Sequence, residues 1–224
     1  FTGSPGTGKT TVARCLAQEL YDMGVLARNQ VLEVSRSELV AGYVGQTAIK
    51  TTKVLDTALG GILFIDEAYT LNQRNGGNAD QFGLEAIDTI LKYMEDNKES
   101  IMVIAAGYEE EMSDFLESNP GLRSRFNRFI HFPDYSDTEL FDVFKSMAEQ
   151  HQYVIHDNAF DLVEQAIKTL RTRHGHKFSN ARAVRNLFEK TIETQASRLV
   201  RANQLSRKEI ETITSEDVSS LIDS

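Results

Sequence analysis

Apolar and polar residues follow two different patterns along the chain, and the change falls near residue 135. Before that point, short apolar runs that predict strands are separated by segments with apolar residues three or four positions apart, which predict amphipathic helices. The predicted strands are Gln30–Val34, Gly61–Ile65, Ile101–Ala106 and Phe129–Phe132. The run Ile62–Ile65 contains no polar residue, so we expect a central strand covered on both faces. This alternation of strands and helices predicts a parallel α/β sheet.

The second part of the chain shows only helical patterns. The first part has predicted helices at Thr11–Tyr21, Thr47–Leu59 and Phe82–Asp96. From Ser136 onward the predicted helices lie at residues 137–151, 157–171, 180–202 and 215–222, with Ser136, Asn180 and Ser215 as N-caps. We therefore expect an α/β domain over residues 1–135 and a small α-helical lid domain over residues 136–224, joined by a hinge at Pro133–Ser136.

The first ten residues carry the chemistry that identifies a ligand class. They read FTGSPGTGKT, a complete G-x-x-x-x-G-K-T loop that is followed by the first predicted helix. Its glycines let the backbone N–H groups turn inward, and the helix adds the positive end of its dipole, so the loop predicts a cradle for phosphates. Lys9 is expected to reach the β- and γ-phosphates, and Thr10 to bind Mg²⁺. The residues predicted to bind the nucleotide are Gly3, Ser4, Pro5, Gly6, Thr7, Gly8, Lys9, Thr10, Thr11 and Asp66.

A buried strand normally leads into such a loop, and here only Phe1 and Thr2 precede it. We therefore expect that strand to be truncated in this chain. The sheet would then have five parallel strands, counting this short first one, with helices on both faces.

Two carboxylates end the predicted central strand. Asp66 and Glu67 follow Ile65 directly, at the edge of the sheet where the phosphate loop is also expected. Asp66 is placed to hold Mg²⁺ and Glu67 to activate the attacking water as a general base. Seen without the phosphate loop, the same pair could be an ordinary solvated strand end.

Composition narrows the classes of partner. The chain has 224 residues and a formal net charge of −9, from 33 acidic and 24 basic residues, which argues against broad binding of nucleic acid. No apolar run is long enough to span a membrane. The single cysteine, Cys15, excludes an internal disulfide and is typical of a reducing compartment, so we expect a cytoplasmic protein.

Several further motifs give the chain a family resemblance. The phosphate loop, Asp66-Glu67, an arginine-bearing segment and a second arginine at a helix start occur in the order typical of AAA+ ATPases. More closely, the chain is similar to the branch that contains red-type Rubisco activase and stage V sporulation protein K. The motifs that carry this resemblance are Tyr43–Thr47, Gly61–Tyr69, Ala106–Tyr108, Asn119–Leu122, Pro120–Phe126, Phe132–Tyr135 and Phe178–Arg182.

The resemblance implies roles for three arginines. Arg125 is similar to the arginine finger that a neighbouring subunit inserts against the γ-phosphate, and Arg123 is the alternative. Arg182 resembles the lid arginine that senses the γ-phosphate in its own subunit and couples hydrolysis to rotation of the lid about Asp134. Lys9, Glu67, Arg125 and Arg182 are thus the expected catalytic residues.

Two tyrosines complete the resemblance. Tyr43 is similar to the aromatic residue that lines the central pore of a ring and grips a threaded polypeptide, although an isolated loop tyrosine can also plug into its own domain. Many AAA+ proteins carry a polar Asn or Thr at the tip of the strand that here ends in Gly107-Tyr108. Which group orients the water is left open by this departure, and Tyr108 is one candidate through its hydroxyl.

Together these expectations describe an ATP- and Mg²⁺-dependent motor subunit that assembles into a homo-oligomeric ring, a hexamer, and remodels a protein substrate through the pore. Assembly follows from the finger, because a lone subunit cannot complete its own site. Two alternatives stay open: a nucleic-acid-linked AAA+ ATPase, such as a clamp loader or helicase, and a non-catalytic ATP-binding switch. The sequence does not identify the remodelled substrate.

Overall fold

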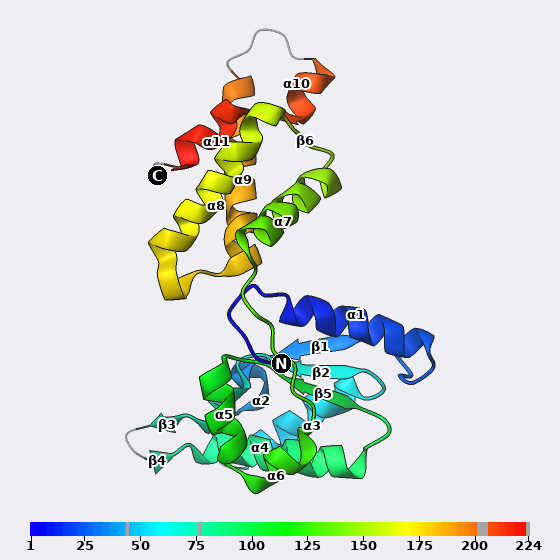
Figure 1. Ribbon diagram of the computed structural model, residues 1–224. Helices are drawn as coiled ribbons and strands as arrows, with labels where there is room; N and C mark the ends of the chain where they lie inside the picture. Colours follow the sequence, from blue (N-terminus) through cyan, green and yellow to red (C-terminus); the bar gives the residue numbers. More distant parts are fainter. Residues whose placement is uncertain (44, 76–77, 201–205, 223–224) are drawn as a thin grey trace. The chain divides into compact units, whose positions relative to one another are not determined.

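The chain divides into two compact units in the computed structural model (Figure 1), which describes residues 1–43, 45–75, 78–200 and 206–222, with the backbone only at 74, 75, 78 and 79. The first unit consists of Phe1–Ser4 and Gly8–Phe132, and the second of Pro5–Thr7 and Pro133–Ser224. The tip of the phosphate loop therefore belongs to the same unit as the C-terminal helices. The boundary expected near residue 135 divides the sequence at a single point, whereas these units are defined by which residues pack together.

The first unit is built on a parallel sheet. Its strands are β1 (Val31–Val34), β2 (Ile62–Ile65) and β5 (Met102–Ala105), in the order β1-β2-β5, with Val31 opposite Ile62 and Ile62 opposite Met102. The sheet continues through Thr2, which forms single parallel bridges with Gly107 and His131. The other two expected strands, the one before the loop and the one at Phe129–Phe132, are thus present only as one-residue bridges. The reason is that only two residues precede the loop, so residues 129–132 have little backbone to pair with.

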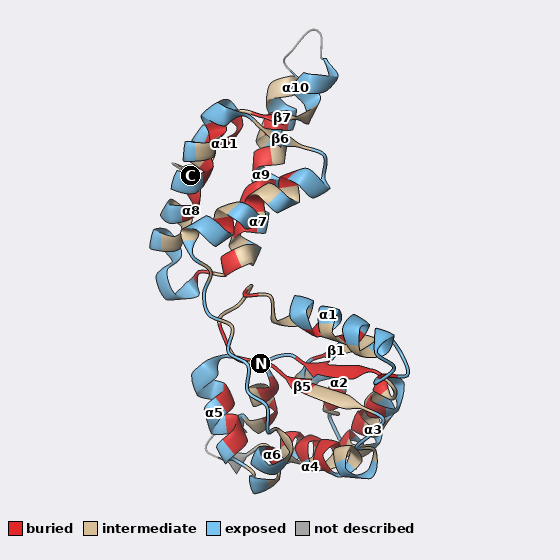
Figure 2. Cartoon of the chain, turned by 45° about the vertical axis from the view of Figure 1, so that its right-hand side comes forward, coloured by how far each residue is buried: buried red, intermediate tan, exposed pale blue. Residues whose placement is uncertain are grey.

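Helices cover both faces of this sheet (Figure 2). Helix α1 (Lys9–Asp22) places Ala13 and Ala17 in one apolar cluster with Ile62 and Phe64. Leu63 and Ile65 belong to the cluster on the opposite face. All four β2 residues are buried, as expected for a central strand. The helices of the opposite face are α2 (Arg36–Leu39), α3 (Thr47–Ala58), α4 (Gln81–Asp96), α5 (Glu109–Glu117) and α6 (Pro120–Arg125).

A short segment between β2 and α4 completes the first unit. It contains the 3₁₀ helix η1 (Ala68–Asn72) and an antiparallel pair, β3 (Arg74–Asn75) with β4 (Asn78–Ala79). Helix α4 then begins after Asp80, whose carboxylate accepts hydrogen bonds from the N–H groups of Phe82 and Gly83. None of the helices that the structure describes has the length and apolar composition of a membrane span.

The second unit is mainly helical. It contains α7 (Asp137–Gln150), β6 (Val154–Ile155), η2 (Asp157–Ala159), α8 (Phe160–His174), η3 (Gly175–Lys177), α9 (Asn180–Leu199), α10 (Arg207–Glu211), β7 (Thr212–Ile213) and α11 (Ser215–Ile222). Its core includes Leu140, Phe144, Ile167, Val184 and Phe188, all buried. The expectation that strands stop at Ser136 was wrong, because β6 and β7 form a short parallel pair.

Of the three predicted N-caps in this unit, Ser136 is confirmed. Its side chain accepts a hydrogen bond from the N–H of Glu139, whose carboxylate in turn accepts one from the N–H of Ser136, a complete capping box. Asn180 is instead the first residue of α9, and Ser215 the first of α11. The Asn180 side chain makes other contacts, described below.

Candidate nucleotide-binding site

The phosphate loop has the backbone that its glycines predict. Gly3, Gly6 and Gly8 all have positive φ angles, of 143°, 72° and 94°. A Cβ atom at Gly3 would lie 2.2 Å from the carbonyl oxygen of Phe132, and one at Gly6 would lie 2.0 Å from that of Ser179. At Gly3 and Gly6 neither the φ angle nor the space admits a side chain, so the loop requires glycine there, and at Gly8 the positive φ angle favours it. This is the curled backbone that an anion-binding nest needs.

Lys9 folds back over this loop. Its Nζ donates hydrogen bonds to the carbonyl oxygens of Gly3, at 2.7 Å, and Ser4, at 2.8 Å. Lys9 is also the first residue of α1, whose first turn carries no acidic side chain. The lysine charge and the positive end of the helix dipole therefore lie together at the loop, an arrangement that fits the phosphates of a nucleotide.

The second motif, Asp66-Glu67, lies at the carboxyl-terminal edge of the sheet, as does the start of the phosphate loop. Asp66 follows β2, and its N–H donates to Val34 O at 2.8 Å. The adjacent strand, β5, leads to Gly107, whose carbonyl accepts a hydrogen bond from the N–H of Gly3 at 3.1 Å. Asp66 and the start of the phosphate loop thus follow the carboxyl-terminal ends of strands in one sheet, where nucleotide sites in parallel α/β folds form.

Asp66 and Glu67 are both exposed at this edge. Glu67 has φ 48° and ψ 47°, a left-handed conformation that is uncommon outside glycine, and its N–H donates to Asp66 Oδ1 at 3.1 Å. Such strained backbone clusters at functional sites. The hydroxyl of Thr10 and the carboxylate of Asp66 are the hard oxygen ligands that Mg²⁺ prefers, so the donor set fits the predicted cation.

Two tyrosines lie beside these carboxylates. The rings of Tyr69 and Tyr108 have centroids 6.3 Å apart, and Tyr108 is partly exposed just before α5. Burial, and then the negative charge of Glu67, raise the pKa of Tyr69 to about 12, because both disfavour the charged phenolate. The sequence pointed to Tyr108 as a candidate for orienting water, but Tyr69 carried no signal of its own.

Arg182 lies on the turn of α9 that meets the loop tip within the second unit. The N–H of Ala181, one residue earlier, donates to Gly6 O at 3.1 Å, and the Arg182 side chain is exposed. The helix start that carries the predicted lid arginine therefore packs on residues of the phosphate loop.

The two candidate finger arginines lie on α6 and pair with carboxylates of the first unit. The Arg125 guanidinium donates to Glu95 at 3.2 Å, and its side chain is 30% exposed. Arg123 donates to Glu117 at 3.2 Å and is 61% exposed. Arg125 would have to leave Glu95 to act on a neighbouring subunit.

Tyr43 lies at the surface of the first unit, with 74% of its surface exposed. The alternative interpretation, that its ring packs into its own domain, is therefore wrong. Val44, the next residue of the expected pore motif, lies outside the described residues. The segment Val40–Gly42, just before Tyr43, lines an open pocket of about 620 Å³ together with Glu67 and Thr70. The base of this loop and the predicted general base therefore border one cavity.

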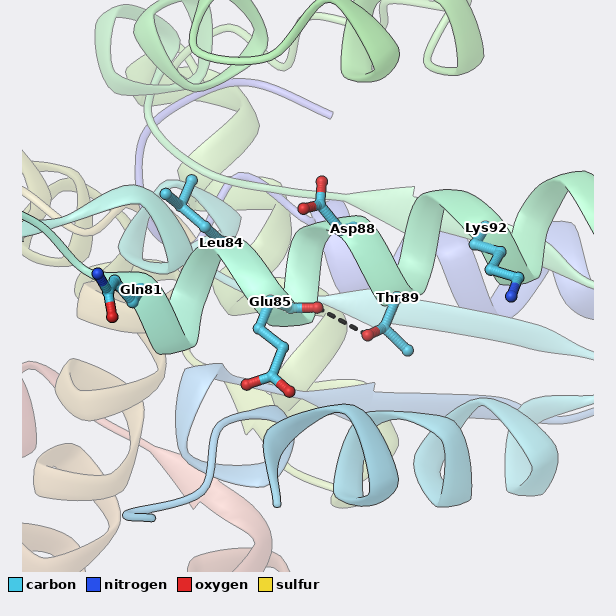
Figure 3. Close-up of a pocket in the computed structure, with 6 residues that line it drawn as sticks. All are labelled: Gln81, Leu84, Glu85, Asp88, Thr89 and Lys92. Carbon is cyan, nitrogen blue, oxygen red and sulfur yellow. Dashed lines mark hydrogen bonds between the residues drawn. The ribbon is translucent and has the colours of Figure 1, made fainter. Parts of the chain in front are cut away.

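A separate pocket of about 450 Å³ lies along α4 (Figure 3). Its lining residues are Gln81, Leu84, Glu85, Asp88, Thr89 and Lys92, all on that helix, with Thr89 Oγ1 donating to Glu85 O at 2.7 Å. None of the residues predicted for the nucleotide site is among them, so we do not assign this pocket to the nucleotide.

A glycine loop that opens a helix beside a parallel sheet, followed by a helical unit, defines the class of P-loop nucleotide-binding proteins with a lid. Comparison with known families gives the same result. The family described as "ATPase family associated with various cellular activities (AAA)" matches residues 1–134, and "AAA lid domain" matches residues 136–224. The chain belongs to the AAA family.

Relatives of known sequence agree with the predicted branch. The chain is 46% identical over 220 residues to stage V sporulation protein K of Bacillus subtilis (strain 168), covering 98% of this chain and 67% of that protein. It is 42% identical over 220 residues to protein CbbX of Cereibacter sphaeroides, covering 97% and 70%. The predicted resemblance is thereby confirmed.

Among solved structures, a point mutant of RuvB from Thermotoga maritima has a similar fold. The TM-score is 0.66 at 22% identity, over 100% of this chain and 60% of the RuvB chain. Identity at that level supports the fold but no shared activity. The predicted AAA+ fold, with its parallel sheet and helical lid, is confirmed.

Proposed function

We propose that this chain is an ATP-hydrolysing, Mg²⁺-dependent AAA+ motor subunit that forms a homo-oligomeric ring and remodels a protein substrate. The observation that carries this proposal is the phosphate loop, in which Lys9 spans the Gly3 and Ser4 carbonyls at the start of α1. Family membership supports ATP as the nucleotide.

Each predicted site residue then has a defined task. Thr10 and Asp66 would hold Mg²⁺, which when bound neutralises charge on the phosphate oxygens. Glu67 orients and deprotonates the attacking water. Arg182 senses the γ-phosphate from the lid, and Arg125 stabilises the transferring phosphoryl group at the neighbouring site.

Two features support a motor that acts on protein rather than on nucleic acid, and a third supports a motor rather than a nucleotide-gated switch. The net charge of −9 disfavours binding along a phosphate backbone. Tyr43 presents an exposed aromatic ring in a loop, which suits contact with an extended polypeptide. The general base and the finger are both parts that a nucleotide-gated switch does not need. We place the protein in the cytoplasm, where its single cysteine would stay reduced.

The test separates nucleotide binding from hydrolysis. Lys9→Ala should abolish ATP binding, because it removes the charge at the loop. Glu67→Gln should bind ATP as the wild type does and hydrolyse it about 10² to 10⁴ times more slowly, because only the base is lost. Binding is measured with a fluorescent ATP analogue, and turnover by phosphate release.

Glu85→Gln on α4 is the matched control, since it makes the same chemical change outside the site. It should behave as wild type in both assays. Equal loss of ATP affinity in Lys9→Ala and Glu67→Gln would contradict the division of roles, and wild-type turnover in Glu67→Gln would remove Glu67 as the base.

A further inference from the structure

Three hydrogen-bond donors of the second unit bind the backbone carbonyl oxygens at the tip of the phosphate loop. Asn180 Nδ2 donates to Pro5 O at 3.3 Å, the N–H of Ala181 donates to Gly6 O at 3.1 Å, and the Tyr135 hydroxyl donates to Thr7 O at 3.2 Å. Pro5–Thr7 belong to the second compact unit, so all three contacts lie within it. The carbonyl groups of Pro5, Gly6 and Thr7 therefore point toward the start of α9 and the hinge.

The direction of these carbonyls fixes the direction of the loop's donors. A trans peptide plane points its C=O and its N–H in opposite directions. When the carbonyls of Pro5, Gly6 and Thr7 point toward the lid side, the N–H groups of Gly6, Thr7 and Gly8 must point away from it. Those are the N–H groups that a phosphate-binding loop offers to its anion.

From this geometry we infer that Asn180 and Tyr135 are positioning residues for the nucleotide phosphates, which orient the N–H groups of the loop by holding its carbonyls. The inference rests on the proposed binding of ATP at this loop. It assigns the hinge and the start of α9 a task in nucleotide binding that is separate from that of Arg182.

Asn180 is suited to this task in two ways. It is fully buried and has φ 46°, in the left-handed region that asparagine tolerates better than most residues. Its side-chain amide uses both ends: Oδ1 accepts from the N–H of Tyr135 at 3.1 Å, and Nδ2 also donates to Asp134 Oδ1 at 2.9 Å. An aspartate could not donate to Pro5 O and would repel Asp134.

Tyr135 is fixed at its backbone as well as at its hydroxyl. Arg171 donates to its carbonyl oxygen and forms an ion pair with Asp137 at 2.9 Å. The Arg171 guanidinium in turn lies over the Phe178 ring, 5.1 Å from its centroid. With Asn180 on its N–H and Arg171 on its C=O, the residue is held in place, so its hydroxyl is pre-organised for Thr7.

The test removes these contacts one at a time. Tyr135→Phe deletes only the hydroxyl, and Asn180→Gly deletes the amide while allowing the positive φ. Each variant loses one hydrogen bond to the loop, so we expect the Kd for both ATP and ADP to rise about 3- to 10-fold in Tyr135→Phe. Asn180→Gly also loses the amide's contacts with Tyr135 and Asp134, so its Kd should rise at least as much. Because the loop holds phosphate in the ground state and the transition state alike, KM should rise with kcat within about twofold of wild type.

The matched control is Tyr93→Phe, which removes a tyrosine hydroxyl that donates to Asp56 at 2.7 Å, away from the phosphate loop. It should leave the Kd unchanged. The melting temperature without nucleotide should be the same in Tyr135→Phe as in wild type, whereas the increase produced by ADP should shrink. This second readout separates positioning from a general loss of stability, and it keeps the test valid if Asn180→Gly folds poorly.

A wild-type Kd in Tyr135→Phe, a loss of kcat without a change in KM, or an equal loss in Tyr93→Phe would overturn the inference. The proposed function fails differently: it fails if Lys9→Ala binds ATP as tightly as wild type. If Lys9→Ala abolishes binding while Tyr135→Phe and Asn180→Gly bind normally, only the inference about positioning is wrong.

Discussion

Tyr43 is the single residue on which the proposed action on protein substrates depends most. It lies in a short loop between α2 and α3, and the base of this loop borders the same pocket as Glu67. Its ring is largely exposed although aromatic residues gain most by burial. An exposed aromatic ring in this loop is available for contact with a molecule outside the chain.

Tyr43→Ala should therefore separate hydrolysis from substrate contact. The side chain contributes aromatic area to a threaded polypeptide and no group to the phosphates, so we expect basal ATPase activity to stay within about threefold of wild type while remodelling is lost. Tyr43→Phe should retain both. The measurement compares phosphate release with unfolding of a tagged substrate.

Tyr21→Ala is the control, because Tyr21 on α1 is also exposed and lies outside this loop. It should change neither activity. If Tyr43→Ala remodels substrate as wild type does, threading through this loop loses its main support.

At the residue scale, the sequence predicted what a contiguous motif can encode. The loop glycines, Lys9 and the carboxylates after β2 occur at fixed spacings, so their chemistry could be proposed without coordinates. Asn180 was interpreted only as a helix cap, because its contact with Pro5 joins residues 175 positions apart. No local pattern records such a contact. The same limit applies to Tyr69, whose raised pKa arises from packing.

At the scale of elements, α9 and α11 are joined by an ion pair between a partly exposed arginine and a buried aspartate. Arg198 Nε donates to Asp217 Oδ1 at 2.7 Å and its terminal nitrogen to Oδ2 at 2.9 Å, while Asp217 also accepts from the N–H of Thr214 at 2.8 Å. The Asp217 side chain is fully buried. The hydrogen bond that Arg198 donates to Asp217 raises the pKa of this arginine, because it favours the charged guanidinium.

Arg198→Ala should lower the free energy of unfolding by about 3 kcal/mol, since it leaves the Asp217 carboxylate buried without its counter-charge. Arg207→Ala removes an exposed pair with Glu211 and should have no measurable effect. Urea unfolding followed by circular dichroism measures both. An equally small change in Arg198→Ala would show that water replaces the guanidinium.

The predicted elements succeeded where the pattern was long. Helix α4 has five buried residues on one face, and the predicted range differs by one residue at its start. The β6–β7 pair was missed because two residues are too few to show a strand period. Helix α8 begins after a 3₁₀ turn that periodicity does not distinguish from a helix, which displaced its predicted start.

At the scale of the whole molecule, the proposed arginine finger makes the site of one chain depend on another. Arg125 and Arg123 are paired with Glu95 and Glu117, carboxylates of the same unit. The partial exposure of Arg125 leaves its guanidinium able to exchange Glu95 for a more negative partner, such as the γ-phosphate held by a neighbouring subunit. A finger supplied in trans would make turnover depend on assembly.

Arg125→Ala should consequently leave the ATP affinity of an isolated subunit unchanged and reduce turnover of the assembled protein by about 10³-fold or more, since the finger acts on the transition state. Mixing Arg125→Ala with Lys9→Ala subunits should restore activity above either parent, because an intact phosphate loop in one subunit can then face an intact finger in the next. Phosphate release across a mixing series measures this. Arg123→Ala, treated in the same way, tests the alternative: if it complements Lys9→Ala and Arg125→Ala does not, Arg123 is the finger, and if neither mixture gains activity, the site is not shared between subunits.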